Sequence, residues 1–219
     1  FLMIRRPPRS TLSIRRQRQM CIRDRPENVA IISKTTPEIM AHSADDSSDK
    51  ISELINKADV IAVGPGLGID HWAKDLFNKA LESEKQIIID ADGLNLLADC
   101  PTKRDNWILT PHPGEAARLL RCLNPEIQED RLTSLEKLVG KYGGVTLLKG
   151  NNTLIGAGEE IPFVITAGNP GMSTAGMGDL LTGIIAALCS QFKQVNPNIL
   201  TALAAYIHAL AGDQAAKSG

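Results

Sequence analysis

The chain has 219 residues and a mass of 23.6 kDa, and apolar residues make up 43% of it, which suits one large globular domain. Aromatic residues make up only 4%, so the core must be built from Leu, Ile, Val and Ala. The ordinary content of 18 glycines and 12 prolines excludes a fibrous or low-complexity chain, and no apolar run reaches the ~20 residues of a membrane-spanning helix.

Charge is distributed unevenly along the chain, although the net charge is only −1. Residues 1–25 hold eight arginines, no lysine and one acid, whereas the remaining residues carry 16 basic and 24 acidic side chains. An acidic body argues against bulk binding of nucleic acid. The four cysteines are scattered without a C-x-x-C pair, which implies neither a zinc site nor a disulfide framework and fits a reducing cytoplasm.

The first 25 residues differ in character from the rest. They are rich in arginine, contain Pro7-Pro8 and show no helical or strand periodicity. An RNA-binding arm or a transit peptide is one interpretation. The favoured interpretation is a non-native segment, because RRPPRSTLS and RQRQMCIRDR resemble the conceptual translation of sequencing-adapter DNA. A single, partial domain is therefore expected over residues 26–219, with the native protein beginning upstream of Pro26.

From residue 29 onward, predicted strands and helices follow one another along the chain. Short apolar or β-branched runs predict strands at 29–33, 60–63, 86–90, 107–109, 145–148, 153–155 and 163–166. Helical spacing of apolar residues predicts helices at 47–58, 70–83, 93–98, 115–121, 131–142, 179–190 and 198–216. This order predicts an α/β sandwich with a mostly parallel central sheet flanked by helices.

Glycine- and proline-rich turns follow several predicted strands, at 64–68, 90–95, 110–115 and 149–153. Parallel sheets bind ligands at the carboxyl ends of their strands, so these turns are expected to line a single crevice. The turn GPGLG at 64–68 is a weak signal by itself, and it is neither a Walker loop nor a dinucleotide-binding fingerprint.

The segment from Gly168 to Asp179, GNPGMSTAGMGD, carries the strongest chemical signal. Its glycines let successive N–H groups point into one concavity, and the following apolar helix adds partial positive charge at its N-terminus. Together they predict an anion hole for a phosphoryl group. Asp179 could be a simple helix cap, but an acid beside an anion hole is placed to take a proton from a hydroxyl during phosphoryl transfer, and we take it as the candidate base.

Other polar residues in these turns are weaker candidates. Asp90, Asp92 and Asn95 suggest a polar site for a metal ion or a ribose. His112 lies between two prolines that fix its backbone, which favours contact with a ligand over a purely structural role. The cation and amides of KGNNT, residues 149–153, fit either a nucleotide contact or a hairpin turn.

His208 is the histidine of the apolar C-terminal helix predicted at 198–216. A lone histidine on an apolar helix is usually a core residue with its hydrogen bonds satisfied, so His208 is expected to be structural rather than a ligand-binding residue.

Taken together, the turn motifs resemble those of the ADP/ATP-dependent NAD(P)H-hydrate dehydratase family. The resemblance rests on GPGLG at 64–68, DADGLNLL at 90–97, LTPHPGEAARLL at 109–120, LLKGNNTLI at 147–155, GNPGMSTAGMGDLLTGIIAAL at 168–188 and HALAGDQAA at 208–216. It implies a ribokinase-like three-layer sandwich. It also implies repair of the S-epimer of hydrated NADH or NADPH, through phosphorylation of the 6-hydroxyl by ADP or ATP and elimination of the phosphate.

The resemblance also implies roles for individual residues. Asp179 would be the base and would contact the substrate together with Gly68 and His112. The transferred phosphoryl group would be held by N–H groups of Ala175, Gly176, Met177 and Gly178. The adenine nucleotide would be held by Lys149, Gly150, Asn151, Asn152, Thr153 and Gly178. Mg²⁺ is the expected cofactor, with no ligands assigned to it, because phosphoryl transfer needs charge neutralisation.

The expected partners are hydrated NADH or NADPH and an adenine nucleotide, with no nucleic acid and no membrane, in the cytoplasm. Family members tend to form homo-oligomers, and bacterial ones often carry an upstream epimerase domain. The chain departs from the family pattern in lacking the glycine-rich first strand–helix unit and the usual final helix. Two alternatives stay open: a ribokinase-like kinase of a vitamin-precursor alcohol, and a non-catalytic nucleotide-binding domain.

Overall fold

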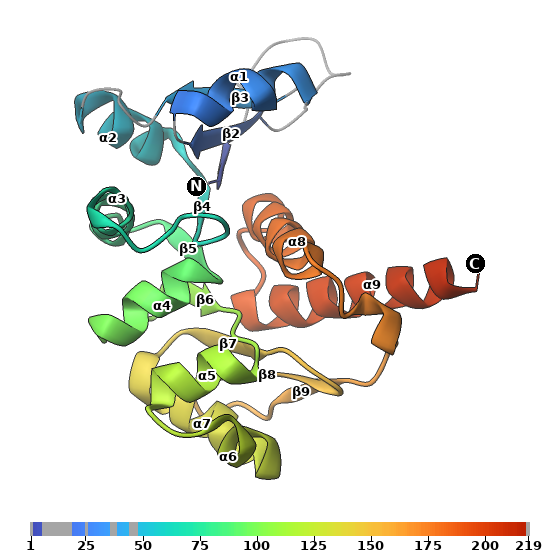
Figure 1. Ribbon diagram of the computed structural model, residues 1–219. Helices are drawn as coiled ribbons and strands as arrows, with labels where there is room; N and C mark the ends of the chain where they lie inside the picture. Colours follow the sequence, from blue (N-terminus) through green and yellow to red (C-terminus); the bar gives the residue numbers. More distant parts are fainter. Residues whose placement is uncertain (1, 6–18, 25, 36–38, 44–47, 218–219) are drawn as a thin grey trace.

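The computed structural model describes residues 2–5, 19–24, 26–35, 39–43 and 48–217, and these form one layered α/β unit (Figure 1). The strands are β1 (Leu2–Arg5), β2 (Gln19–Asp24), β3 (Met40–Ser43), β4 (Val60–Val63), β5 (Gln86–Ile89), β6 (Trp107–Leu109), β7 (Val145–Leu148), β8 (Thr153–Ala157) and β9 (Phe163–Ile165). The helices are α1 (Pro26–Thr35), α2 (Ser48–Lys57), α3 (His71–Leu81), α4 (Asp92–Asp99), α5 (Pro113–Leu120), α6 (Asn124–Glu129), α7 (Arg131–Tyr142), α8 (Met177–Gln191) and α9 (Pro197–Ala216), with a 3-10 turn, η1 (Pro170–Met172).

One sheet runs through the molecule in the order β3-β2-β1-β4-β5-β6-β7-β8-β9. Its centre, β4 to β7, is parallel throughout, as expected for strands joined by crossover helices. Antiparallel pairs flank this centre, with β1 between β2 and β4 on one side and β8 and β9 on the other. The parallel centre and its helices confirm the α/β class predicted from the sequence.

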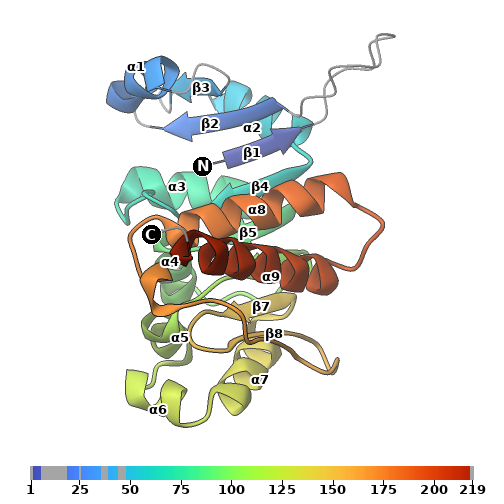
Figure 2. The same ribbon diagram turned by 90° about the vertical axis from the view of Figure 1, so that its right-hand side faces the viewer.

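Helices cover both faces of the sheet and make two separate cores. Alternate residues of a strand point to opposite faces, so Ile87 and Ile89 pack against the core of α2 to α5 and α7, whereas Ile88 packs against α8 and α9. Figure 2 shows α8 and α9 lying together across their face of the sheet. Because both faces of the central strands are buried, those strands read as continuous apolar runs in the sequence.

Two expectations for the N-terminal part are wrong. Residues 29–33 were expected to form a strand, but they belong to α1, in which partly buried Asn28, Val29 and Ile32 have helical spacing and Ile31 is exposed. Residues 1–25, which show no strand periodicity and were left out of the predicted fold, contain β1 and β2, and these two strands pair with each other. Its non-native origin stays a prediction. The strand β3 and the short helix α6 were not anticipated.

The remaining elements begin and end close to the residues predicted from the sequence. The match is residue for residue in β4, β6, β7 and α7, and α8 begins two residues before the predicted start at Asp179. Within the described ranges, no helix is both long and apolar enough to cross a membrane.

The burial of the central strands yields a test of stability. Ile88 is fully buried between the two helix layers, whereas Val164 on the outer strand β9 is 53% exposed. We expect Ile88→Ala to lower the free energy of unfolding by about 2–5 kcal/mol, because it removes buried methyl groups and leaves a cavity. The matched truncation Val164→Ala should cost less than about 1 kcal/mol. Urea unfolding of both variants measures the difference, and equal losses would contradict the assignment of the core.

Candidate active site

Backbone hydrogen bonds continue between neighbouring parallel strands after the strands end. They bring together the turns in which the sequence predicts site residues. The N–H of Asp90 donates to the carbonyl of Val63 over 3.1 Å, and the N–H of Thr110 donates to Ile89 over 3.1 Å. The N–H of Lys149 then donates to the carbonyl of Pro111 over 2.8 Å. The turns after β4, β5, β6 and β7 therefore lie side by side at the carboxyl edge of the sheet, as the sequence predicted.

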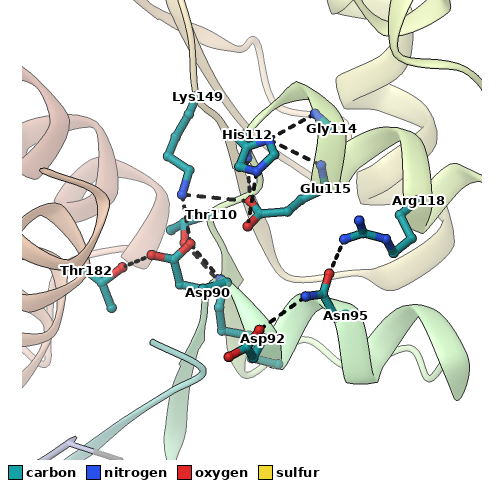
Figure 3. Close-up of polar contacts among 12 residues, drawn as sticks. Asp90, Asp92, Asn95, Thr110, His112, Gly114, Glu115, Arg118, Lys149 and Thr182 are labelled. Carbon is teal, nitrogen blue, oxygen red and sulfur yellow. Dashed lines mark hydrogen bonds and ion pairs between the residues drawn. The ribbon is translucent and has the colours of Figure 1, made fainter. Parts of the chain in front are cut away.

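Asp90 is the buried centre of this edge, with 1% of its surface exposed (Figure 3). Its Oδ1 accepts hydrogen bonds from Lys149 Nζ over 2.8 Å and from the N–H of Ala91 over 2.9 Å, and its Oδ2 accepts one from Thr182 Oγ1 over 2.8 Å. Both carboxylate oxygens are thus occupied by protein donors. Asp90 anchors three chain segments, and the metal or ribose contact suggested by the sequence stays a prediction.

The backbone of the turn after β4 fits closely over Asp90. A Cβ atom on Gly64 would lie 1.7 Å from the carbonyl oxygen of Asp90, and the φ of Gly64 is +131°. Only glycine fits there. Four residues on, the N–H of Gly68 donates to Asp92 Oδ2 over 2.9 Å. Asn95 and Arg118 extend this hydrogen-bonded chain from Asp92 (Figure 3).

Lys149 places a positive charge beneath the first turn of α8. Its Nζ lies 2.8 Å from Asp90 Oδ1 and 3.9 Å from Glu115 Oε2. A Cβ atom on Gly178 would lie 3.4 Å from the same Nζ, so the ammonium group and the backbone of Gly178 are neighbours. An ammonium group carries three N–H donors, and Asp90 uses one of them. The predicted nucleotide-binding residue thus lies next to the predicted anion hole.

The N-terminus of α8 is open toward ligands. Gly176 is its N-cap, with a φ of +84° and no side chain to cap the first-turn N–H groups. Those groups carry the partial positive charge of the helix N-terminus. Asp179 lies in the same turn and is exposed, as are Ala175 and Gly176, whereas Met177 and Gly178 are half-buried. This geometry fits an anion hole with an acid beside it.

His112 is a helix cap, which the sequence analysis did not foresee. Its Nδ1 accepts from the N–H groups of Gly114 over 3.0 Å and Glu115 over 3.4 Å, and the Glu115 carboxylate accepts from the N–H of His112 over 2.8 Å. This is a capping box at the start of α5. Because Nδ1 is an acceptor, Nε2 carries the proton in the neutral ring. The side chain is 56% exposed, and its Nε2 lies 3.5 Å from Glu115 Oε1.

A cavity of about 780 Å³ extends from this edge of the sheet to α9. It brings together most of the predicted site residues: His112, Lys149, Gly150, Asn151, Asn152, Thr153, Met177 and Gly178. It does not include Gly68, Ala175, Gly176 or Asp179. The predicted nucleotide-binding residues and His112 therefore share one cavity, whereas the candidate base Asp179 and Gly68 lie outside it.

Asp213 on α9 holds the loop that leads into the anion hole. Its Oδ2 accepts from the N–H of Gly168 over 2.9 Å, and its Oδ1 accepts from Asn169 Nδ2 over 3.0 Å. The hydrogen bonds from the Asn169 side chain and the Gly168 backbone hold the pKa of Asp213 below its ordinary value. Sequence reasoning missed both Asp213 and Thr182, since each acts through a partner more than forty residues away along the chain.

Comparison with known proteins finds both a matching family model and a similar curated relative. The family model described as NAD(P)H-hydrate dehydratase matches residues 20–219. A bifunctional NAD(P)H-hydrate repair enzyme from Coxiella burnetii is 46% identical over 195 residues, which cover 89% of this chain and 39% of the relative. The chain thus spans about two fifths of the length of that relative.

Solved structures share the fold. A ribokinase-like superfamily protein from Enterococcus faecalis superposes with a TM-score of 0.80 at 30% identity, covering 90% of this chain and 69% of that one. The ADP/ATP-dependent NAD(P)H-hydrate dehydratase from Bacillus subtilis, co-crystallised with ATP and Mg²⁺ and soaked with CoA, gives 0.70 at 26% identity, covering 84% and 67%. The predicted ribokinase-like fold is confirmed.

The pairing of Lys149 with Asp90 can be tested by a double-mutant cycle. We expect Lys149→Met to lower the free energy of unfolding by about 3 kcal/mol, because it leaves the buried Asp90 carboxylate without its counter-charge. Adding Asp90→Asn should restore part of that loss, since the neutral amide needs no counter-charge. Chemical denaturation of the two single variants and the double variant gives the coupling. Strictly additive losses would show that the two side chains do not interact.

The lowered pKa of Asp213 makes the hold on the Gly168 loop dependent on pH. A carboxylate whose pKa is lower in the folded state stabilises the fold above its unfolded pKa, and that contribution disappears as the pH falls through the folded value. Asp213→Asn should therefore lower the melting temperature near pH 7, and the difference from the parent protein should vanish in strong acid. Thermal melts across the acid range measure this. If the difference in melting temperature between Asp213→Asn and the parent protein persisted unchanged in acid, the stabilisation by the Asp213 carboxylate would be refuted.

Proposed function

The chain belongs to the NAD(P)H-hydrate dehydratase family, and from this premise we propose that it repairs hydrated nicotinamide nucleotides. In the proposed reaction, the S-epimer of NADH hydrate or NADPH hydrate is returned to NADH or NADPH while ADP or ATP loses its terminal phosphate. The observation that carries the proposal is the open N-terminus of α8, which has the Lys149 ammonium group on one side and the exposed acid Asp179 in its first turn.

The proposed chemistry begins with phosphoryl transfer. Asp179 takes the proton of the substrate 6-hydroxyl as that oxygen attacks the terminal phosphorus, and the bond between phosphorus and the leaving nucleotide oxygen breaks. The N–H groups of residues 175–178 stabilise the charge on the transferred group. The lone pair of the ring nitrogen then expels the phosphate from C6, and loss of a proton from C5 restores the dihydropyridine ring.

The site residues are proposed to serve the two substrates of this reaction, with His112 lining the same cavity as the nucleotide-binding residues and Gly68 and Asp179 outside it. Lys149 to Thr153 and Gly178 line the cavity and are proposed to hold the adenine nucleotide. Gly68, His112 and Asp179 are proposed to contact the hydrated dinucleotide. Because Asp90 offsets the charge of Lys149, the ammonium group can lie in a protected position and still offer N–H donors to phosphate oxygens.

Mg²⁺ is the proposed cofactor. Among the described residues no cluster of three or more potential metal ligands occurs. Mg²⁺ is commonly held by one or two carboxylates, several waters and the phosphates of the nucleotide, so the residues present fit an ion bound mainly through the substrate. The nearby carboxylate of Glu115 already accepts the N–H of His112 in the capping box of α5, so no protein ligand is assigned to the ion. The ion would supply charge neutralisation for the phosphates.

A further domain, the oligomeric state and the cellular compartment concern the whole protein, and each is a proposal. The Coxiella burnetii relative is named as bifunctional and is much longer than this chain, so we propose that the complete protein carries an epimerase domain upstream. Homo-oligomerisation stays a prediction. We propose the cytoplasm as the compartment, and the free cysteines Cys100, Cys122 and Cys189 fit a reducing environment.

A direct assay tests the proposal. Hydrated NADH is incubated with the chain and either ADP or ATP, and recovery of the absorbance of reduced nicotinamide is followed. Asp179→Asn should slow the recovery by about 10²–10⁴-fold, because the base for the 6-hydroxyl is lost. Asp99→Asn makes the same chemical change at the exposed C-terminal end of α4 and should leave the rate unchanged.

The products separate the alternatives. Recovery of NADH with release of inorganic phosphate supports the dehydratase. Comparison of the rates with ADP and with ATP identifies the phosphate donor. The bacterial style of the sequence favours ADP. A stable phosphorylated alcohol would indicate a kinase of the same fold. Nucleotide binding by folded protein without any turnover would indicate a binding domain and would refute the proposed activity.

A further inference from the structure

Arg131, the first residue of α7, holds the turn that carries the proposed nucleotide-binding residues. Its Nη2 donates to the carbonyl of Leu148 over 3.1 Å and to the carbonyl of Lys149 over 3.3 Å. Its Nη1 donates to Gln128 Oε1 over 3.2 Å. The guanidinium group therefore binds two successive carbonyls of the chain as it leaves β7.

The turn is built to let this guanidinium group come close. A Cβ atom on Gly150 would lie 2.9 Å from Arg131 Nη1, which is too near for a side chain. The φ of Gly150 is +140°, a conformation that residues with a side chain rarely adopt. Glycine at this position therefore serves both the turn and the approach of Arg131.

The charge of Arg131 is not offset by an acid in the described part of the chain. Its three hydrogen bonds go to neutral oxygens, and burial lowers its pKa with no acid acting against that effect. The adjacent Asp130 instead caps α7, by accepting from the N–H of Thr133 over 2.9 Å. A guanidinium group remains charged at neutral pH, and a cation in the first turn opposes the helix dipole. Arg131 is thus electrostatically unfavourable where it lies, which requires an explanation.

The hydrogen bonds from Arg131 fix the direction of the peptide group between Lys149 and Gly150. The peptide bonds of the described residues are trans, and in a trans peptide group the N–H points opposite to the C=O. Because the carbonyl of Lys149 points to Arg131, the N–H of Gly150 points away from it. The preceding peptide group behaves in the same way: the carbonyl of Leu148 faces Arg131, and the N–H of Lys149 donates to Pro111 over 2.8 Å.

The N–H of Gly150 is open to a ligand. It has no hydrogen-bond partner among the residues that the structure describes. Gly150 is exposed, and it lines the cavity together with Lys149. A backbone N–H next to an ammonium group suits a phosphate oxygen, because both are donors and the ammonium group adds charge.

We propose that Arg131 is a positioning residue of the nucleotide site. It holds the peptide group between Lys149 and Gly150 so that the N–H of Gly150 and the ammonium group of Lys149 bind the phosphates of ADP or ATP together. This inference rests on the proposed nucleotide-dependent function, and it adds a residue that none of the turn motifs contains. It also explains why an unpaired cation is kept at the start of α7.

The inference predicts a loss of phosphate affinity when the guanidinium group is removed. Arg131→Met keeps an unbranched side chain but removes the charge and the donors. The dissociation constants for ADP and for pyrophosphate should each rise about tenfold, the lower value for one hydrogen bond to a charged group. The KM for hydrated NADH should not change. Arg131→Lys keeps the charge and can hold one carbonyl, so it should bind both ligands more tightly than Arg131→Met and more weakly than the parent.

The N–H of Gly150 can be observed directly, because residues 149 and 150 are the only Lys-Gly pair in the sequence. Labelling lysine carbonyls with ¹³C and glycine with ¹⁵N leaves one signal in an NMR spectrum that correlates a carbonyl with the following N–H. Titration of the full chain with pyrophosphate and Mg²⁺ should move its proton shift downfield. The movement at the same ligand concentration should be smaller in Arg131→Met. Arg121→Met removes the same charge at the exposed C-cap of α5 and is the matched control, with no expected change.

Each other outcome overturns the inference. Unchanged affinities in Arg131→Met would show that the guanidinium group does not serve the nucleotide site. A Gly150 signal that stays in place while the parent binds pyrophosphate would show that this N–H does not contact phosphate. Equal weakening in Arg131→Met and Arg121→Met would show a general effect of charge, and a raised KM for hydrated NADH would show a general disturbance.

Two further results separate the fold and the function from the inference. Unfolding of both Arg131 variants would show that the residue serves the fold, and it would overturn the positioning role. If the parent chain binds neither ADP nor pyrophosphate, the proposed function falls as well. Loss of the Arg131 effect alone leaves that function standing.

Discussion

The buried carboxylate of Asp90 is the constraint on which the site depends. It lies at the end of the central strand β5 and binds Lys149 after β7, Thr182 in α8 and the N–H of Ala91. Gly64 after β4 fits against its backbone with no room for a side chain. Four chain segments therefore keep fixed positions around one charge. Removing that charge, or its partner, would leave a buried group without compensation, which couples the stability of the fold to the geometry of the site.

Helix α8 divides the site. On the side of the cavity lie the Lys149 loop and α9, which suit a nucleotide; outside the cavity lie Asp179 and the turn that carries Gly68. In the proposed reaction, the transferred group would pass the N-terminus of this helix, where N–H groups without a side-chain cap carry positive charge.

Two polar side chains of α9 stand apart from its apolar packing. Asp213 uses its carboxylate to hold the Gly168 loop, and His208 keeps a polar atom in an apolar place without a partner. Neither contact strengthens the hydrophobic packing of α9 on the sheet, which its alanines and Leu200 already provide.

The sequence by itself determined the parallel centre of the sheet, the order of strands and helices from residue 48 onward apart from α6, and the turns that meet at the carboxyl edge. Apolar periodicity and glycine placement are local signals, and they sufficed for α7 and for the glycine-led start of α8. Tertiary structure alone decided the partners of Asp90, the anchoring of Gly168 by Asp213, the helix-capping role of His112 and the missing partner of His208. It also placed residues 29–33 in a helix, because the partial burial of Val29 and Ile32 selects helical spacing. A hydrogen bond between residues forty or more positions apart depends on how the sheet brings their elements together, and no local pattern records it.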